Sequence, residues 1–85
     1  MLNAEYSNNA KKFLKKSDRE LAKRILDRIE ELQKDPLPSD KKKVEGRKDE
    51  VYRVRVGHYR ILYVIFKEKN ILLIADIDKR SRVYD

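Results

Sequence analysis

The sequence contains no cysteine and no tryptophan, a single histidine, and only two residues each of proline and glycine among 85. Without cysteine there is no disulfide, and one histidine cannot supply a Cys/His set for a structural metal, so stability has to come from packing, ion pairs or a partner chain. No apolar run approaches the roughly 18 residues of a membrane span, and the first residues lack the apolar core of a secretory signal. We therefore expect one small cytoplasmic domain, residues 1–85, with no metal, no cofactor and no membrane contact.

Most catalytic motifs are also absent. The sequence has no glycine-rich phosphate-binding loop, no H-E-x-x-H zinc motif and no cysteine nucleophile. Asp76 and Asp78 share one face of a predicted strand, but two carboxylates among so many arginines more often form ion pairs than bind a cation. We interpret both as structural. The remaining candidates for chemistry are arginines and a tyrosine.

What the sequence has in excess is positive charge. Lys and Arg number 22 against 15 Asp and Glu, a net charge of +7. Residues 1–40 hold nine basic and eight acidic side chains, a net of +1, so residues 41–85 hold thirteen and seven, a net of +6. A charge excess confined to one half is typical of a surface that binds a polyanion, because phosphate neutralisation drives nucleic-acid binding. The run Lys41–Lys43, taken alone, is interpreted as a solvated loop.

The first half predicts a strand followed by two helices. Leu2, Ala4 and Tyr6 alternate with polar residues, as in a strand, and Ser7 can cap the helix that follows. The segment Ser17–Glu20 has the S-x-x-E form of a capping box, and the D-P-L-P run ends the second helix. Apolar residues recur between these signals at helical spacing: Leu21, Ile25, Leu26, Ile29 and Leu32.

The second half changes to a period of two and predicts an antiparallel meander. Alternation of apolar and cationic side chains places Arg53 and Arg55 on one exposed face of a strand. Gly57-His58 predicts a tight turn, residues 59–66 a central strand covered on both faces, and residues 71–77 a further strand. A strand, a helical hairpin and then three or four antiparallel strands form an α+β fold, with the helices on one face of the sheet and the other face free.

The exposed face of this meander gathers the residues that suit phosphate chemistry. The tight turn places Arg53 and Arg55 beside Arg60, and the last antiparallel segment brings Arg80 and Tyr84 within reach. Guanidinium groups suit bidentate phosphate contacts and stabilise the added negative charge of a pentacoordinate phosphorus. A tyrosine can stack on a base or transfer a proton. The residues favour an RNA- or DNA-binding surface, with a merely solvated cationic face as the alternative.

The order of these residues resembles that of a known family. The run V-Y-R-V-R-V-G-H-Y-R-I-L-Y at 51–63 is similar to the Y-R-[IV]-R-[VL]-G-x-Y-R-[IV]-x-Y core of RelE/ParE superfamily toxins. The run K-R-S-R-V-Y at 79–84 is similar to the closing H-R-x-x-V-Y of that family. The helical hairpin and the P-L-P break occur in the same order, so the resemblance covers nearly the whole chain. It implies a RelE-type toxin of a type II toxin–antitoxin system.

The resemblance also implies an activity and partners. RelE-type toxins bind the ribosomal decoding site and cleave messenger RNA there without a metal, by attack of the ribose 2′-hydroxyl on the adjacent phosphate, which inhibits translation. A cognate RelB-like antitoxin forms a hetero-oligomer with the toxin; we expect it over the helical hairpin and the sheet edge, with acidic residues toward the cationic face. By position, Arg60 would stabilise the phosphorane, Arg80 would assist the leaving 5′-oxygen, and Tyr84 would orient or deprotonate the nucleophile. The implied RNA-binding residues are Arg53, Arg55, Lys79 and Arg82.

The identity of the base and of the target stays open. Well-known bacterial family members carry lysine where this chain has Arg53 and Arg55, and arginine holds its proton too tightly to act as a base. Tyr84 is the preferred base; His58, in the adjoining turn, is the alternative because it titrates near neutrality. ParE-type toxins share the fold and act on DNA gyrase, so a gyrase-directed toxin and a noncatalytic RNA-binding module are competing interpretations.

Overall fold

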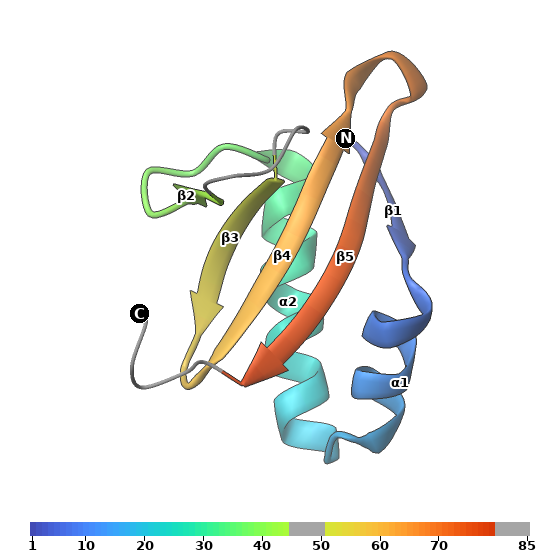
Figure 1. Ribbon diagram of the computed structural model, residues 1–85, viewed down its shortest axis with the longest axis vertical. Helices are drawn as coiled ribbons and strands as arrows, with labels where there is room; N and C mark the ends of the chain where they lie inside the picture. The colour runs from blue at the N-terminus through green and yellow to red at the C-terminus, as the bar shows by residue number, and fades with distance from the viewer. Residues whose placement is uncertain (45–50, 80–85) are drawn as a thin grey trace.

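The computed structural model describes residues 1–44 and 51–79, which form one five-stranded sheet with two helices packed beside it (Figure 1). The strands lie in the order β1-β5-β4-β3-β2; β1 runs parallel to β5, and every other neighbouring pair is antiparallel. In chain order, the elements are β1 (Asn3–Tyr6), α1 (Asn8–Lys16), α2 (Arg19–Lys34), β2 (Lys42–Lys43), β3 (Val51–Val56), β4 (Tyr59–Phe66), the short 3-10 helix η1 (Lys67–Lys69) and β5 (Ile71–Lys79).

The architecture confirms the predicted α+β fold, with two differences at the edges of the sheet. The N-terminal strand lies parallel beside the C-terminal strand β5, so the sheet is mixed rather than a pure meander. The interpretation of Lys42 and Lys43 as solvated loop is wrong, because both pair with β3 as the edge strand β2. Two adjacent lysines have no apolar pattern, so their pairing at a sheet edge leaves no signal in the sequence.

A carboxylate begins the second helix, and this corrects a prediction. The Ser17 capping box is wrong, because Ser17 ends α1 and its hydroxyl donates a 2.7 Å hydrogen bond to the Phe13 carbonyl. The N-cap of α2 is Asp18, whose carboxylate accepts a 2.8 Å hydrogen bond from the Leu21 amide. A carboxylate is favoured here both by that hydrogen bond and by the positive end of the helix dipole.

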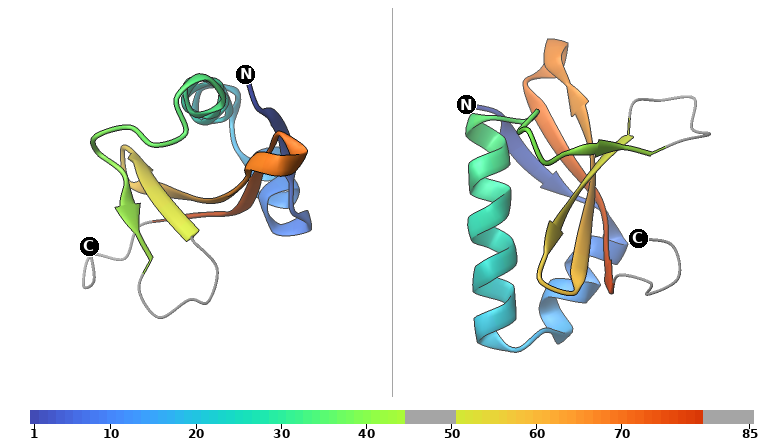
Figure 2. Two further views of the ribbon diagram at one scale, coloured as in Figure 1. Left: turned by 90° about the horizontal axis from the view of Figure 1, so that it is seen from above. Right: turned by 90° about the vertical axis from the view of Figure 1, so that its left-hand side faces the viewer.

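One face of the sheet packs against α2 and forms the hydrophobic core (Figure 2). Ile25, Ile29 and Leu32 of α2 are buried, so the apolar stripe predicted from helical spacing is used by the core, while Leu26 stays 44% exposed. Among the described residues, no helix is long and apolar enough to cross a lipid bilayer. From the sheet, the core receives Val54, Ile61, Tyr63, Leu72, Ile74 and Ile77.

The side of the sheet opposite α2, which we call the open face, carries no helix in the part of the chain that the structure describes (Figure 2). Ile61 and Tyr63 of β4 are buried on the helix side, whereas Leu62 and Val64 between and beyond them are half-buried. β4 is therefore fully covered on the helix side and only partly covered on the open face, so the prediction of cover on both faces holds in part. Composition predicted full burial because β4 is apolar on both faces, and composition does not specify where the helices pack.

A β-bulge interrupts the pairing of β4 and β5. Tyr63 pairs with Ile74 and Leu62 pairs with Asp76, so Ala75 is the extra residue on β5. Such a bulge shifts the alternation of side chains by one position and increases the local twist. Even-numbered residues of β5 therefore face α2 before the bulge, and odd-numbered residues face α2 after it.

The bulge decides where the acidic residues of β5 point. Leu72 and Ile74 face α2, and uninterrupted alternation would turn Asp76 and Asp78 to the same side. Beyond the bulge, Ile77 occupies the helix side, where it is 3% exposed, and both carboxylates reach the open face. Burying two carboxylates in an apolar core would be strongly unfavourable. The strand also continues to Lys79, two residues further than predicted.

Ser7 holds the bulge and the start of α1 together. Its hydroxyl donates a 2.7 Å hydrogen bond to the Ala75 carbonyl and accepts a 3.1 Å hydrogen bond from the Ala10 amide, as the predicted N-cap does. Its own amide donates to the Ile74 carbonyl at 3.0 Å. α1 consequently begins against the edge of β5, just where β1 ends (Figure 1).

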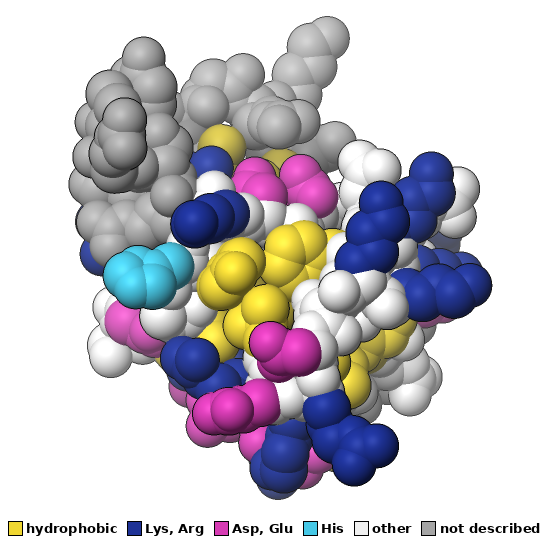
Figure 3. Space-filling view, turned by 90° about the horizontal axis from the view of Figure 1, so that it is seen from below, with side chains coloured by type: hydrophobic (Ala, Val, Ile, Leu, Met, Phe, Trp, Pro, Cys, Tyr) yellow, Lys and Arg dark blue, Asp and Glu magenta, His cyan; other side chains and the backbone are white. Residues whose placement is uncertain are grey.

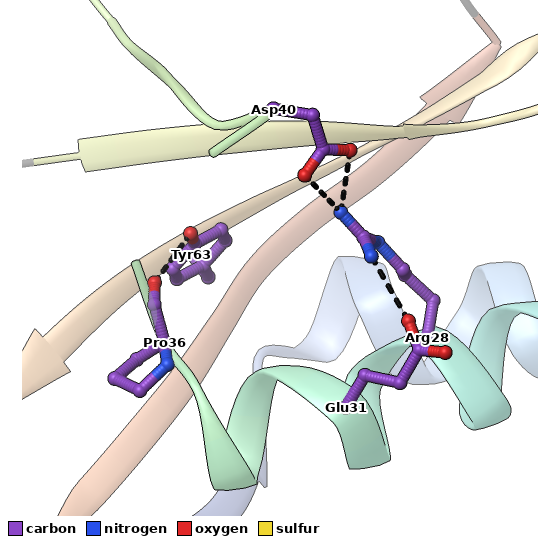
Figure 4. A network of polar contacts seen from close by, with 5 residues as sticks. All are labelled: Arg28, Glu31, Pro36, Asp40 and Tyr63. Atoms are coloured by element: carbon purple, nitrogen blue, oxygen red, sulfur yellow. Dashed lines mark hydrogen bonds and ion pairs between the residues drawn. The ribbon is translucent and has the colours of Figure 1, made fainter. Parts of the chain in front are cut away.

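Tyr63 connects the centre of the sheet to the segment that follows α2. Its side chain is fully buried, and its hydroxyl donates a 2.7 Å hydrogen bond to the Pro36 carbonyl (Figure 4). Burial raises the pKa of this hydroxyl well above the ordinary tyrosine value of 10.0. The folded protein therefore requires Tyr63 in its neutral form.

We expect Ser7→Ala to lower the free energy of unfolding by about 1 to 2 kcal/mol, because it removes the N-cap of α1 and the side-chain bond to the bulge. Ser17→Ala is the matched control and should cost about 0.5 kcal/mol or less, because the half-buried Ser17 hydroxyl makes one local hydrogen bond whose acceptor is not left unsatisfied. The Phe13 carbonyl also keeps the hydrogen bond from the Ser17 amide. Urea unfolding followed by circular dichroism measures both, and equal losses would contradict the role given to Ser7.

We expect Tyr63→Phe to lower the free energy of unfolding by about 1 to 2 kcal/mol at pH 7, because the half-buried Pro36 carbonyl loses the hydrogen bond from the buried Tyr63 hydroxyl. Above pH 10 this difference should shrink. The hydroxyl of Tyr63 then ionises in the unfolded wild type but not in the folded protein, which lowers the free energy of unfolding of the wild type. The variant has no hydroxyl at this position, so its free energy of unfolding lacks this pH dependence. Tyr59→Phe, at a half-exposed tyrosine, serves as the control. A difference that stays constant from pH 7 to 11 would contradict this linkage.

Candidate nucleic-acid interface

The turn between β3 and β4 brings the arginines of the two strands together. Gly57 and His58 form it, and Gly57 has a φ of 59°, as the first residue of a type II′ turn requires. A Cβ on Gly57 would lie 2.8 Å from Nη2 of Arg24, so a side chain there would also require the flexible Arg24 side chain to move. In the register set by this turn, Arg55 pairs directly with Arg60, as the sequence predicted.

Arg60 lies on the open face between a cation and a carboxylate. Arg55 is opposite on β3, and Asp78 is opposite on β5. Oδ1 of Asp78 accepts a 3.0 Å hydrogen bond from Nε of Arg60, whose side chain is only 19% exposed. Like charges directly opposite on neighbouring strands repel, and the Asp78 carboxylate offsets that repulsion while it orients the guanidinium. The interpretation of Asp78 as an ion-pair residue is confirmed.

A second row of side chains crosses the open face beside the first. Lys42 on β2 pairs with Arg53 on β3, Arg53 pairs with Leu62 on β4, and Leu62 pairs with Asp76 on β5. Oδ1 of Asp76 accepts a 2.9 Å hydrogen bond from the Ile77 amide, so this carboxylate supports the backbone just after the bulge. The part of the chain that the structure describes holds no group of three histidine or acidic side chains arranged to bind a metal.

Both rows run from a basic residue on β3, which in one row has Lys42 of β2 beside it, to a carboxylate on β5. The first row is Arg55, Arg60 and Asp78; the second is Lys42, Arg53, Leu62 and Asp76. The electrostatic potential of these described residues is therefore most positive over β3 and β2 and falls toward β5. A phosphate backbone gains most by lying over the basic side, where guanidinium groups provide paired donors.

The end of the molecule beside the turn has a different character (Figure 3). His58 lies exposed at this end, among basic and acidic side chains that surround an apolar patch. Phe13 and Tyr59 are in edge-to-face contact, with ring centroids 5.5 Å apart. Lys79 pairs with Tyr59 on the helix side of the sheet, so the structure does not bring Lys79 to the row of Arg60. The adjoining hollow, of about 400 Å³, is lined by Phe13, Lys16, Ser17, Asp18, Leu21 and Tyr59.

The structure therefore brings together only part of the predicted site. Arg53, Arg55 and Arg60 share the open face through the pairing of β3 and β4. Lys79 lies on the helix side and His58 lies in the turn. The other predicted residues, Arg80, Arg82 and Tyr84, lie outside the described residues.

Three features of this surface were not found from the sequence. Lys42 joins it through the edge strand β2, and Asp78 becomes the partner of Arg60 only because of the bulge. Arg24 approaches the turn from the polar side of α2, which a helical pattern marks only as solvated. One signal was available for Asp78: an alternation that breaks between Ile74 and Ile77 is typical of a β-bulge.

Comparisons with known proteins agree on one family. The family model described as "ParE toxin of type II toxin-antitoxin system, parDE" matches residues 4–84. The RelE1 protein of Methanocaldococcus jannaschii is 35% identical over 85 residues, which cover 96% of this chain and 93% of that protein. The archaeal RelE–RelB complex from Pyrococcus horikoshii OT3 contains a chain with a TM-score of 0.81 and 26% identity, covering 95% of this chain and 97% of that one.

The fold is shared more widely than the sequence. The isolated E. coli RelE toxin has a TM-score of 0.81 at only 22% identity, over 99% of this chain and 92% of its own. The family model covers nearly the whole of residues 1–85, including the strands that carry the open face. The chain therefore belongs to the RelE/ParE family of toxins of type II toxin–antitoxin systems.

Proposed function

We propose that the chain is a RelE-type endoribonuclease that cleaves messenger RNA at the decoding site of the ribosome and thereby inhibits translation. In this reaction a ribose 2′-hydroxyl attacks the adjacent phosphate. The observation that carries the proposal is the position of Arg60 on the open face, directly opposite Arg55 and hydrogen-bonded at 3.0 Å to Asp78. Membership of the RelE/ParE family supports the same reaction.

Arg60 is assigned to the phosphorane. When the 2′-hydroxyl attacks, the phosphorus gains a fifth oxygen ligand and its oxygens gain negative charge. A guanidinium that is oriented before the reaction stabilises this charge without having to reorganise, which is the main source of electrostatic catalysis. Asp78 supplies that orientation through Nε of Arg60. Arg53 and Arg55 are assigned to the flanking phosphates, to which guanidinium groups bind with paired donors.

Proton transfer is assigned to the C-terminal motif, which lies outside the described residues. Arg80 would assist the leaving 5′-oxygen, and Tyr84 would orient or deprotonate the 2′-hydroxyl. The arginines of β3 are unsuited to this task, because a guanidinium keeps its proton up to a pH of about 12 or more. His58 remains the alternative base, and its exposed position in the turn allows solvent and substrate to reach it. Arg82 is assigned to RNA binding, whereas Lys79 pairs with Tyr59 on the helix side and is not assigned to the row of Arg60.

We also propose a cognate RelB-like antitoxin that forms a hetero-oligomer with this chain, as the related Pyrococcus horikoshii complex contains RelB beside RelE. The apolar stripe of α2 is buried in the core and cannot dock a partner, but Leu26 on the same helix is 44% exposed. β1 forms one edge of the sheet and can accept a further strand. Acidic residues of the antitoxin would meet the basic rows of the open face.

We expect the protein to cut a defined messenger within its translated frame in a cell-free translation extract, with primer extension mapping the RNA ends. Arg60→Ala should slow cutting by at least about 100-fold, because removing one donor to a developing oxyanion typically has this effect. Lys67→Ala is the matched control, since it removes one exposed cation from η1, at the opposite end of β4 from the turn (Figure 1). It should leave cutting unchanged.

The variant Arg60→Ala/Arg80→Ala/Tyr84→Phe should not cut at all while circular dichroism shows it to be folded. Intact messenger and continuing translation in the presence of the wild-type protein would contradict the nuclease proposal. Inhibition of DNA supercoiling by gyrase would then indicate a gyrase-directed toxin, and RNA binding without cleavage would indicate a noncatalytic module.

We expect an equimolar amount of the purified cognate antitoxin to abolish cutting in the same extract. The physical reason is that acidic side chains over the open face compete with RNA phosphates for the same cations. The complex is isolated by size-exclusion chromatography and assayed directly. Undiminished cutting by a stable complex would refute neutralisation by coverage of this face.

A further inference from the structure

The edge strand β2 adds a basic residue to the open face on one side and to the helix side on the other. Lys42 pairs with Arg53, and Lys43 pairs with Tyr52. Paired residues on neighbouring antiparallel strands point to the same face, so Lys42 extends the row that contains Arg53. Lys43 has the same charge and exposure but belongs to the face of Tyr52, whose ring packs 5.9 Å from that of Tyr63.

A hollow at this edge joins β2 to β3. Its volume is about 200 Å³, which is enough for a phosphate group, and three of its lining residues are Lys42, Arg53 and Arg55. Asp40 also lines it and is the acidic residue among the described lining residues. A free carboxylate at this point would repel a phosphate, so the state of Asp40 decides whether the hollow suits an anion.

Arg28 engages Asp40 from the helix side. Nη2 of Arg28 donates to both carboxylate oxygens of Asp40, at 2.7 and 2.6 Å, and Nη1 donates to Glu31 at 2.9 Å (Figure 4). The Arg28 side chain is only 20% exposed. Burial opposes its charge, yet the hydrogen bonds to Glu31 and Asp40 outweigh burial and raise the pKa of Arg28 above its ordinary value. Asp40 is therefore held two residues before Lys42, and Arg28, which Glu31 shares, offsets part of its charge.

The uneven distribution of charge on the open face favours phosphate binding at the same edge, between β2 and β3. Both rows end in a carboxylate on β5, Asp78 in one and Asp76 in the other, and their basic ends lie on β3 and β2. A phosphate next to the one bound at Arg60 therefore meets attraction toward β2 and repulsion toward β5. The charges of the open face therefore favour one path for the backbone of a bound strand, from Arg60 toward β2.

We propose that Lys42 binds an RNA phosphate in the hollow between β2 and β3, and that Arg28 is a positioning residue that holds Asp40 and the start of β2 for this contact. The proposal deepens the RNA-binding part of the proposed function and names a further phosphate subsite for it. It does not depend on the chemical step. Lys42 acts through charge, and Arg28 acts without touching the RNA.

The test compares Lys42→Ala with Lys43→Ala, which remove the same charge from opposite faces of one strand. Fluorescence anisotropy measures binding of a fluorescein-labelled single-stranded oligouridylate over a series of salt concentrations. Loss of one phosphate contact should lower the slope of log affinity against log salt by about 0.7 for a single strand and weaken binding several-fold. We expect this change for Lys42→Ala and an unchanged slope for Lys43→Ala.

Arg28→Gln tests the positioning role by coupling. In this background, Lys42→Ala should change the slope by less than it does in the wild-type background, because β2 is no longer held for the contact. A structural defect elsewhere would instead leave the effect of Lys42→Ala the same. Circular dichroism verifies that each variant is folded; if Arg28→Gln is unfolded, the comparison of Lys42 with Lys43 decides the proposal alone.

Equal slope changes for Lys42→Ala and Lys43→Ala, or no change for Lys42→Ala, would overturn the subsite. These results are distinct from failure of the proposed nuclease. RNA binding that depends on Lys42 together with intact messenger in the translation extract would refute the nuclease and support the subsite. Cleavage by a protein whose RNA affinity is independent of Lys42 would do the reverse.

Discussion

The β-bulge at Ala75 is the constraint on which the open face depends. A strand presents alternate residues to opposite faces, so without an extra residue the two acidic side chains of β5 would lie in the apolar core. With it, Ile77 completes the core, and Asp78 meets Arg60 at 3.0 Å. Ser7 bonds the carbonyl of the bulge at 2.7 Å and caps α1, so one side chain holds both the change of register and the place where the helix begins.

The same register concentrates positive charge, which a domain of this size tolerates only with compensation. Arg55 faces Arg60 directly, and Lys42 faces Arg53. Such pairs destabilise a sheet, and a thin core leaves little stability to spare. The carboxylates at the β5 end of each row offset part of the repulsion. They also give the open face a basic side that suits phosphate and an acidic side that repels it. The same carboxylates therefore offset the repulsion within the sheet and determine on which side a phosphate backbone binds.

The second helix links the core to that face. Its apolar side supplies Ile25, Ile29 and Leu32 to the core, whereas its polar side supplies Arg28, which holds Asp40 ahead of β2. Tyr63 ties the same connecting segment to the centre of the sheet through Pro36 (Figure 4). The segment after α2 is therefore fixed at two points, from the helix and from the sheet, before the chain pairs with β3. These contacts lead the chain to the edge of β3, where Lys42 and Lys43 pair with Arg53 and Tyr52.

The sequence by itself determined the features that depend on neighbours along the chain. These are the buried stripe of α2, the alternation along β3, the two-residue turn at Gly57, and with that turn the pairing of Arg55 with Arg60. Only the tertiary structure decided that β1 lies beside β5, that β2 exists, and that Asp78 reaches Arg60. The reason is distance along the chain: Ser7 and the bulge it bonds are 68 residues apart, and no local propensity encodes a partner so remote. Local patterns specify which residues are basic and exposed, and long-range pairing specifies which of them meet.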